Sequence, residues 1–189
     1  MLHCDARGET VNRDVTALKL LWRSVFHDDD ATIDAFFDEW YAPELCAAVG
    51  ESELAAMGFL MPIGDLVQPN KPDLPCAMIY AVATALEFRG RGYGSEVTRG
   101  LLKLADECGF GAAILHPADG GLFAFYERCG LHTSFFEFDV TLPRDAPLVK
   151  VTPSEYRERR EVLLADIPHI AFSVRALEYA ERSFGAGGL

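Results

Sequence analysis

The residues whose types and spacing most clearly suggest a binding function form a glycine-rich run, Arg89-Gly90-Arg91-Gly92-Tyr93-Gly94-Ser95. The continuous apolar residues 77–83 before it predict a strand buried on both faces. After the run, apolar residues recur at helical spacing up to a stop at Gly109, at positions Val97, Leu101, Leu104, Ala105 and Cys108. Glycines let the backbone pass close to a ligand, and the first amides of a helix have no partner within the helix. We therefore expect backbone amides here to bind an anion such as a phosphate.

Spacing excludes two common phosphate-binding motifs. The loop of nucleotide hydrolases needs a Lys-Ser or Lys-Thr pair after its second glycine, and this run has none. The dinucleotide fingerprint needs a glycine three residues after the second one, where this chain has Ser95. The sequence thus does not predict a kinase, an ATPase or a dinucleotide-binding protein.

A second motif, Leu122-Phe123-Ala124-Phe125-Tyr126-Glu127-Arg128-Cys129-Gly130-Leu131, follows a strand predicted at 112–115. Together the two motifs resemble the GNAT superfamily of N-acetyltransferases, over about residues 14–142. That family has an Arg/Gln-x-x-Gly-x-Gly/Ala loop and a later Phe-Tyr-Glu-Arg-x-Gly signature, and this chain matches both in order. It most resembles the first domain of the enhanced-intracellular-survival (Eis) group, through residues 80–84 and 115–118.

The resemblance implies a donor and a set of binding residues. The donor is acetyl-CoA, and no metal is needed. Its pantetheine arm would enter between two splayed strands and pair with the backbone of Val82, Ala83 and Thr84, with an amide near Val82 facing the thioester oxygen. Its pyrophosphate would lie on the amides of the glycine-rich run, helped by the charges of two arginines. The residues expected there are Arg89, Gly90, Arg91, Gly92, Tyr93, Gly94 and Ser95.

Tyr126 matches the family tyrosine that protonates the CoA thiolate, which is reasonable chemistry because a phenol and a thiol have similar pKa values. The alternative is a tyrosine that only packs, within an aromatic cluster of Phe123, Phe125 and Tyr126. An acetylated amine must also lose a proton, and the sequence leaves that base open. Four residues are candidates by position alone: Glu51, Glu53, His116 and His132.

Acidic residues are concentrated in one segment. The formal net charge is −12, and there is no Lys or Arg between Ser24 and Asn70. Nucleic acid is a poor partner for such a surface. In the resembled family the first two helices form one wall of the acceptor site, so acids there imply a cationic amine, either a small molecule or a peptide. The other interpretation is a solvated face. The ten acids are Asp28, Asp29, Asp30, Asp34, Asp38, Glu39, Glu44, Glu51, Glu53 and Asp65.

The predicted fold class is α/β: the GNAT fold, with a mixed, mostly antiparallel sheet, a splayed strand pair and flanking helices. We expect a GNAT domain at 1–142 and a helical extension at 143–189, interpreted as a link to the second domain of longer relatives. Helices are predicted at 14–26, with Val15, Leu18, Trp22 and Val25 facing inward, and from a cap at Asp30 to residue 40. Further helices are predicted after residue 92, around Tyr126, at 153–165 from a capping box, and at 173–184. Strands are predicted at 45–49, 54–62, 77–83, 112–115 and 132–142, and the region 64–75 is predicted as a turn, with a short strand in it as the alternative.

The five cysteines are scattered and never spaced as Cys-x-x-Cys, which favours reduced thiols and argues against a zinc site. The sequence has no signal-peptide pattern and no apolar run of about 18 residues, so we expect a cytoplasmic protein that does not span a membrane. The predicted activity is transfer of an acetyl group from acetyl-CoA to a primary amine. Alternatives are a non-catalytic acyl-CoA-binding or regulatory module, or one half of a two-domain enzyme. A homo-oligomer is also compatible with the sequence.

Overall fold

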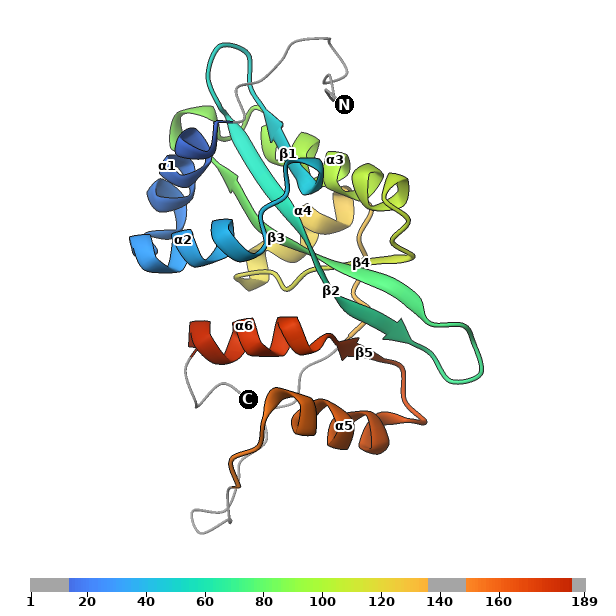
Figure 1. The fold of residues 1–189 in the computed structure, drawn as a ribbon. Helices are drawn as coiled ribbons and strands as arrows, with labels where there is room; N and C mark the ends of the chain where they lie inside the picture. The colour runs from blue at the N-terminus through green and yellow to red at the C-terminus, as the bar shows by residue number, and fades with distance from the viewer. Residues whose placement is uncertain (1–13, 136–148, 185–189) are drawn as a thin grey trace.

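A computed structural model describes residues 14–135 and 149–184. Its centre is a five-stranded mixed sheet with the strand order β1-β2-β3-β4, in which β5 also pairs with β2 (Figure 1). The strands are β1 (Cys46–Val49), β2 (Ala56–Val67), β3 (Leu74–Thr84), β4 (Ala112–Ile114) and β5 (His169–Phe172). Only β3 and β4 pair in parallel. The predicted α/β fold class is therefore confirmed.

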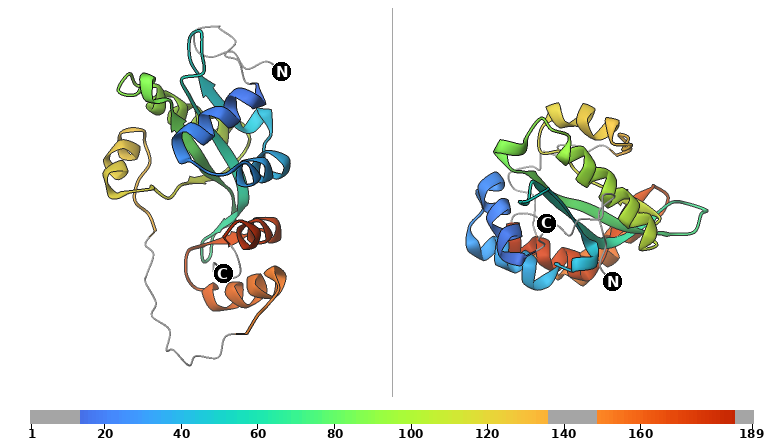
Figure 2. Two further views of the ribbon diagram at one scale, coloured as in Figure 1. Left: turned by 90° about the vertical axis from the view of Figure 1, so that its left-hand side faces the viewer. Right: turned by 90° about the horizontal axis from the view of Figure 1, so that it is seen from above.

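One face of the sheet is covered by α1 (Val15–Phe26) and α2 (Asp30–Glu39) (Figure 2). Trp22 and Phe36 are buried between these helices and the sheet, where their rings contact Phe59 and Tyr80. Each helix begins at an aspartate whose carboxylate accepts a backbone N–H, Asp14 for α1 and Asp29 for α2. The sequence analysis placed the N-cap of α2 at Asp30, one residue after the observed N-cap, Asp29. Val15, expected to face inward, is 36% exposed.

The opposite face carries α3 (Tyr93–Glu107), which follows the glycine-rich run. Val97, Leu101 and Ala105 are buried against the sheet, as the spacing predicted. Cys108 is exposed and caps the helix, so its assignment to the apolar face was wrong. The short helix α4 (Phe123–Arg128) contacts α3 on this side.

The hairpin of β2 and β3 is longer than predicted. β2 continues to Val67 and β3 begins at Leu74, so most of the region 64–75 is strand and only the segment between them turns. Pro62 and Gly64 lie at a register shift between β2 and β3. The shift tolerates the missing backbone N–H of Pro62 and the φ of +147° at Gly64. A Cβ at Gly64 would lie 2.0 Å from the carbonyl oxygen of Ala171, because β5 passes close to it. The glycine therefore marks a strand contact rather than a turn.

The C-terminal extension consists of α5 (Pro153–Leu164), β5 and α6 (Val174–Phe184). The predicted capping box is confirmed, since Thr152 and Glu155 exchange both hydrogen bonds. β5 was not predicted, and it adds the extension to the edge of β2 that β1 also uses. The ring of Tyr179 in α6 packs edge-on against Trp40, with the two ring centres 5.8 Å apart. The Tyr179 side chain is also hydrogen-bonded to that of Tyr80. Of the strand predicted at 132–142, residues 132–135 are not strand and the rest lies outside the described residues.

Candidate active site

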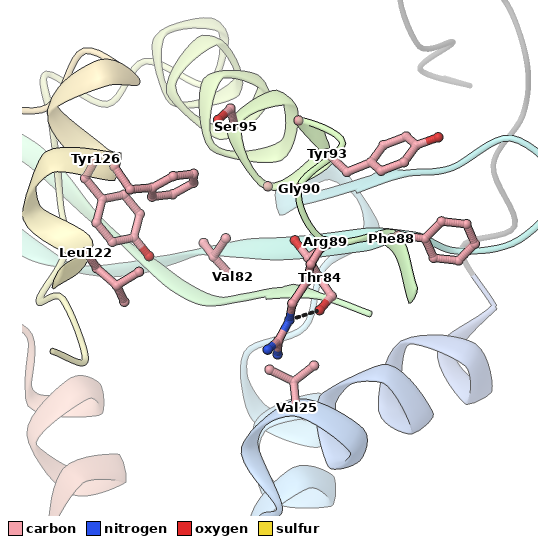
Figure 3. A pocket seen from close by; sticks show the side chains of 13 residues that line it. Val25, Val82, Thr84, Phe88, Arg89, Gly90, Tyr93, Ser95, Leu122 and Tyr126 are labelled. Atoms are coloured by element: carbon pink, nitrogen blue, oxygen red, sulfur yellow. Dashed lines mark hydrogen bonds between the residues drawn. The ribbon is translucent and has the colours of Figure 1, made fainter. Parts of the chain in front are cut away.

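A cavity of about 420 Å³ lies where β3, the start of α3 and α4 meet (Figure 3). Nine of the sequence-predicted site residues line it: Val82, Thr84, Arg89, Gly90, Gly92, Tyr93, Gly94, Ser95 and Tyr126. Two predicted residues, Ala83 and Arg91, do not line it. Ala83 is buried on the other face of β3. The guanidinium carbon of Arg91 lies 5.5 Å from the centre of the Phe88 ring. Two motifs that are far apart in the sequence thus share one cavity.

The glycine-rich run forms an open cradle at the start of α3. Gly90 and Gly92 have φ values of +76° and +91°, and a Cβ on either would meet nothing within 4 Å. Glycine is needed there for the backbone angle rather than for space. Gly92 is the N-cap of α3, and no side chain caps that helix, whereas Asp14, Asp29 and Thr152 cap α1, α2 and α5. The first amides of α3 are therefore available for an anion.

Gly94 has a different role, because its Cα faces other side chains. A Cβ there would lie 3.1 Å from Oγ1 of Thr84 and 3.5 Å from Cζ of Phe125. The first turn of α3 is thus packed directly against the end of β3 and against α4. This close packing fixes the cradle relative to Tyr126.

The strands β3 and β4 separate beside the cradle. Their pairing covers only Cys76–Met78 and Ala112–Ile114, while β3 continues to Thr84. On its other side β3 stays paired with β2, but the register shifts between Met57 and Phe59. Ala81 lies in this bulge with a φ of +49°, an uncommon angle for a residue other than glycine. Such a bulge changes the direction of neighbouring peptide groups, here those next to Val82, which lines the cavity.

Tyr126 projects from α4 into the cavity, with its hydroxyl between Leu122 and Val82 (Figure 3). Burial raises the pKa of this hydroxyl above its ordinary value, and the nearby Cys129 adds to the rise. The phenol is therefore protonated at neutral pH and can act as a proton donor. Its ring also packs edge-on against Phe125 at 4.9 Å, so the aromatic cluster expected from the sequence is partly present.

Arg89 is held at the end of β3. Its Nε donates a hydrogen bond of 3.3 Å to the carbonyl oxygen of Thr84, and Figure 3 shows the guanidinium on the side facing Val25. Arg89 is the one charged side chain among the cavity-lining residues that the structure describes. It therefore fixes the loop and gives the cavity a positive charge.

None of the ten acids of the acidic segment lines the cavity. Several of its carboxylates are engaged elsewhere: Asp28 accepts from Nε1 of Trp22 at 2.8 Å, Asp34 pairs with Lys19 at 2.6 Å, Asp30 pairs with Arg23, and Glu39 pairs with Arg182. Helix capping, ion pairs and a hydrogen bond thus engage these carboxylates in the structure.

The four candidate bases also lie outside the cavity lining. Glu51 and Glu53 are exposed in the β1–β2 connection, and His116 and His132 are exposed near β4 and after α4. The described residues contain no cluster of three or more His, Cys, Asp or Glu side chains that could hold a metal ion. No helix in the described ranges is long and apolar enough to cross a membrane.

Sequence reasoning did not assign four residues that line the cavity: Val25, Phe88, Leu122 and Phe125. Phe88, Leu122 and Phe125 lie within or next to the two motifs, so their positions could have suggested them. Val25 was predicted to face inward from its helical spacing, but no local signal shows that the last turn of α1 reaches the cradle.

A family model described as the acetyltransferase (GNAT) family matches residues 15–131. The chain belongs to this family. Members use acetyl-CoA as the acyl donor, which agrees with an uncapped, glycine-rich helix start beside a half-buried tyrosine. The match includes both motifs and ends after α4, so the C-terminal extension lies outside the matched residues.

Solved structures show the same fold. A protein of Agrobacterium tumefaciens str. C58, named as an acetyltransferase, is 24% identical with a TM-score of 0.53, covering 68% of this chain and 94% of that one. A conserved protein of Enterococcus faecalis V583, described as a probable N-acyltransferase, is 15% identical with a TM-score of 0.61, covering 89% of this chain and 46% of that one. This second similarity extends into the C-terminal extension.

Eis1 from Mycobacterium abscessus is also similar, at 15% identity and a TM-score of 0.47, covering 57% of this chain and 27% of that one. The chain thus spans nearly all of the Agrobacterium protein but less than half of the other two. A search of curated proteins found no match.

Proposed function

We propose that this chain is an N-acetyltransferase that moves an acetyl group from acetyl-CoA to a primary amine. The observation that carries the proposal is the arrangement of the cavity: an uncapped helix start with two positive-φ glycines on one side, and the hydroxyl of the half-buried Tyr126 on the other. An anion-binding cradle and a protonated phenol are what transfer from a CoA thioester requires at its two ends.

In this proposal the amides of Gly90 to Ser95 bind the pyrophosphate, and the α3 dipole adds to the attraction. The charges of Arg89 and Arg91 contribute at longer range, since their side chains are held by Thr84 and Phe88. The backbone of Val82, Ala83 and Thr84 pairs with the pantetheine arm in the space left by the separation of β3 from β4.

The reaction is a direct attack. The nitrogen lone pair of the neutral amine forms a bond to the thioester carbonyl carbon, and negative charge develops on the carbonyl oxygen. An amide near Val82, reoriented by the bulge at Ala81, donates to that oxygen. The carbon–sulfur bond then breaks and Tyr126 gives its proton to the thiolate. The nitrogen loses its extra proton to solvent or to a base outside the cavity lining, and Tyr126 regains a proton from solvent.

The acceptor enters a largely apolar environment, because Val82, Leu122 and Phe125 line the cavity near Tyr126. Moving an ammonium group out of water into such a site favours its neutral form, which is the form that attacks. The proposal therefore specifies an amine that is neutral at the moment of attack. It does not depend on the acidic residues between Asp28 and Glu39.

Donor binding is tested by calorimetric titration with acetyl-CoA. We expect wild type to bind, and Gly92→Glu to lose binding because a carboxylate at the N-cap of α3 repels phosphates. The matched control is Gly109→Glu at the other end of α3, where φ is +81° and a Cβ also meets nothing within 4 Å. This control carries the same backbone strain and should bind as wild type does. Equal binding by the Gly92 and Gly109 variants would contradict the assigned cradle.

A further inference from the structure

The helix α5 has an apolar stripe that the described residues leave uncovered. Val162 and Leu163 are each 78% exposed and Ile167 is 53% exposed, and no residue of α5 is buried. The helix contacts only α6 and β5 closely and lies at the end of the molecule away from α1 and α3 (Figures 1 and 2). Helices of this length are marginal without packing, and clustered exposed apolar side chains mark an interaction surface.

The charges of α5 narrow the choice of partner. The whole chain has a net charge of −12, but α5 contains three Arg and three Glu, and so is neutral. A neutral surface gives no advantage to nucleic acid or to an anionic membrane, both of which are bound through clustered cations. It does allow a second copy of this acidic chain to approach without strong local repulsion.

The order of residues along the stripe is self-complementary. Arg159, Val162, Leu163 and Asp166 recur at helical spacing, and all four are exposed. The stripe therefore has a cation at one end, an anion at the other and two aliphatic side chains between. A shallow groove lined by Glu158, Arg159, Val162 and Leu163 lies along it. Turning such a helix by 180° about its midpoint places each charge opposite its counterpart.

We propose that two copies of this chain associate through α5, packed antiparallel about a two-fold axis between Val162 and Leu163. In this arrangement Val162 contacts the partner's Leu163, and Arg159 faces the partner's Asp166. Each contact occurs twice, as an isologous interface requires. The dimer is separate from the acetyl-CoA cavity, so it does not depend on the proposed activity.

The interface is small, because it uses one helix and the turn after it from each copy. Specific interfaces below about 1,200 Å² are usually weak. We therefore expect reversible association with a dissociation constant on the order of micromolar to tens of micromolar.

Sedimentation velocity from about 1 to 200 µM tests the dimer across that range. Wild type should shift from monomer to dimer, and Leu163→Glu should remain monomeric throughout. The control is Leu20→Glu on α1, where the leucine is also exposed, at 57%, and where association should be unchanged. Because both leucines lie at the surface, neither variant should alter the circular dichroism spectrum.

Charge reversal tests the antiparallel arrangement. Arg159→Glu alone and Asp166→Arg alone should each weaken association by about threefold or more, since each places like charges together. The double variant should recover most of the wild-type affinity. A wild-type monomer at every concentration would overturn the proposal, as would a dimer that Leu163→Glu does not disrupt. A double variant weaker than both single variants would overturn the two-fold register.

Discussion

At the scale of single residues, Tyr126 is the side chain on which the proposed chemistry depends. Its ring is anchored in α4 beside Phe125, and its hydroxyl lies in the cavity where β3 and β4 separate. Burial is the main cause of its raised pKa. At any pH near the ordinary tyrosine pKa of about 10, Tyr126 therefore keeps more of its proton than an exposed tyrosine would.

Replacing Tyr126 with Phe keeps the ring and removes the proton donor. We expect kcat to fall by about 10² or more, while the dissociation constant for acetyl-CoA changes less than about threefold. The wild-type pH profile should show no fall due to this residue below about pH 10. Steady-state kinetics and calorimetry measure these quantities, with Tyr156→Phe on α5 as the control. Unchanged kcat in the Tyr126 variant would rule out the proton-donor role.

The sequence predicted which segments form the site better than it predicted where individual side chains point. The cradle and Tyr126 do share one cavity. Arg91, in contrast, packs on Phe88. Several acids between Asp28 and Glu39 cap α2, form ion pairs or accept a hydrogen bond from the Trp22 indole. Such choices depend on partners distant in sequence, which spacing alone does not specify.

At the scale of elements, the start of α3 is the part most tightly specified by its sequence. It has glycines where φ is positive, no side-chain cap, and a first turn packed against Thr84 and Phe125. Elements with such local signals, including the capping box of α5, were predicted correctly. The length of β2 was not, because Pro62 and Gly64 indicate a turn in isolation and are accommodated in the strand only by a register shift and by β5.

Gly94→Ala tests the packing of α3 at its first turn. Its Cβ would lie 3.1 Å from Oγ1 of Thr84. Either this side chain, which ends β3 beside the cradle, or the first turn of α3 must shift by a few tenths of an ångström. We expect acetyl-CoA affinity to fall by about 3- to 30-fold, since charge-assisted bonds weaken with poor geometry. Calorimetric titration measures the change.

The matched control for that change is Gly100→Ala in the same helix. There the Cβ would meet only the Cβ of Ala47, at an ordinary 3.8 Å. Affinity should be unchanged, and the free energy of unfolding should rise by about 0.5–1 kcal/mol because alanine is favoured over glycine inside a helix. If both variants bind acetyl-CoA as wild type does, the close packing at Gly94 has no role in the cradle.

At the scale of the whole molecule, the C-terminal extension belongs to the same sheet as the family domain. β5 pairs with β2, and α6 buries Tyr179 against Trp40 on the face covered by α1 and α2. The expected division at 1–142 and 143–189 thus separates a domain from an extension that shares its core. The two helices of the extension differ in burial: α6 completes this core, whereas α5 has no buried residue.

Product formation tests the central claim most directly. Purified protein would be incubated with acetyl-CoA and a panel of primary amines, with free CoA thiol measured by a colorimetric reagent and acetylated amine by mass spectrometry. The account predicts that at least one amine yields acetylated product and free thiol in equal amounts, and that the thiol is not released without it. Bound acetyl-CoA with no acetylated amine, or thiol release that is independent of every amine, would contradict the proposed transfer.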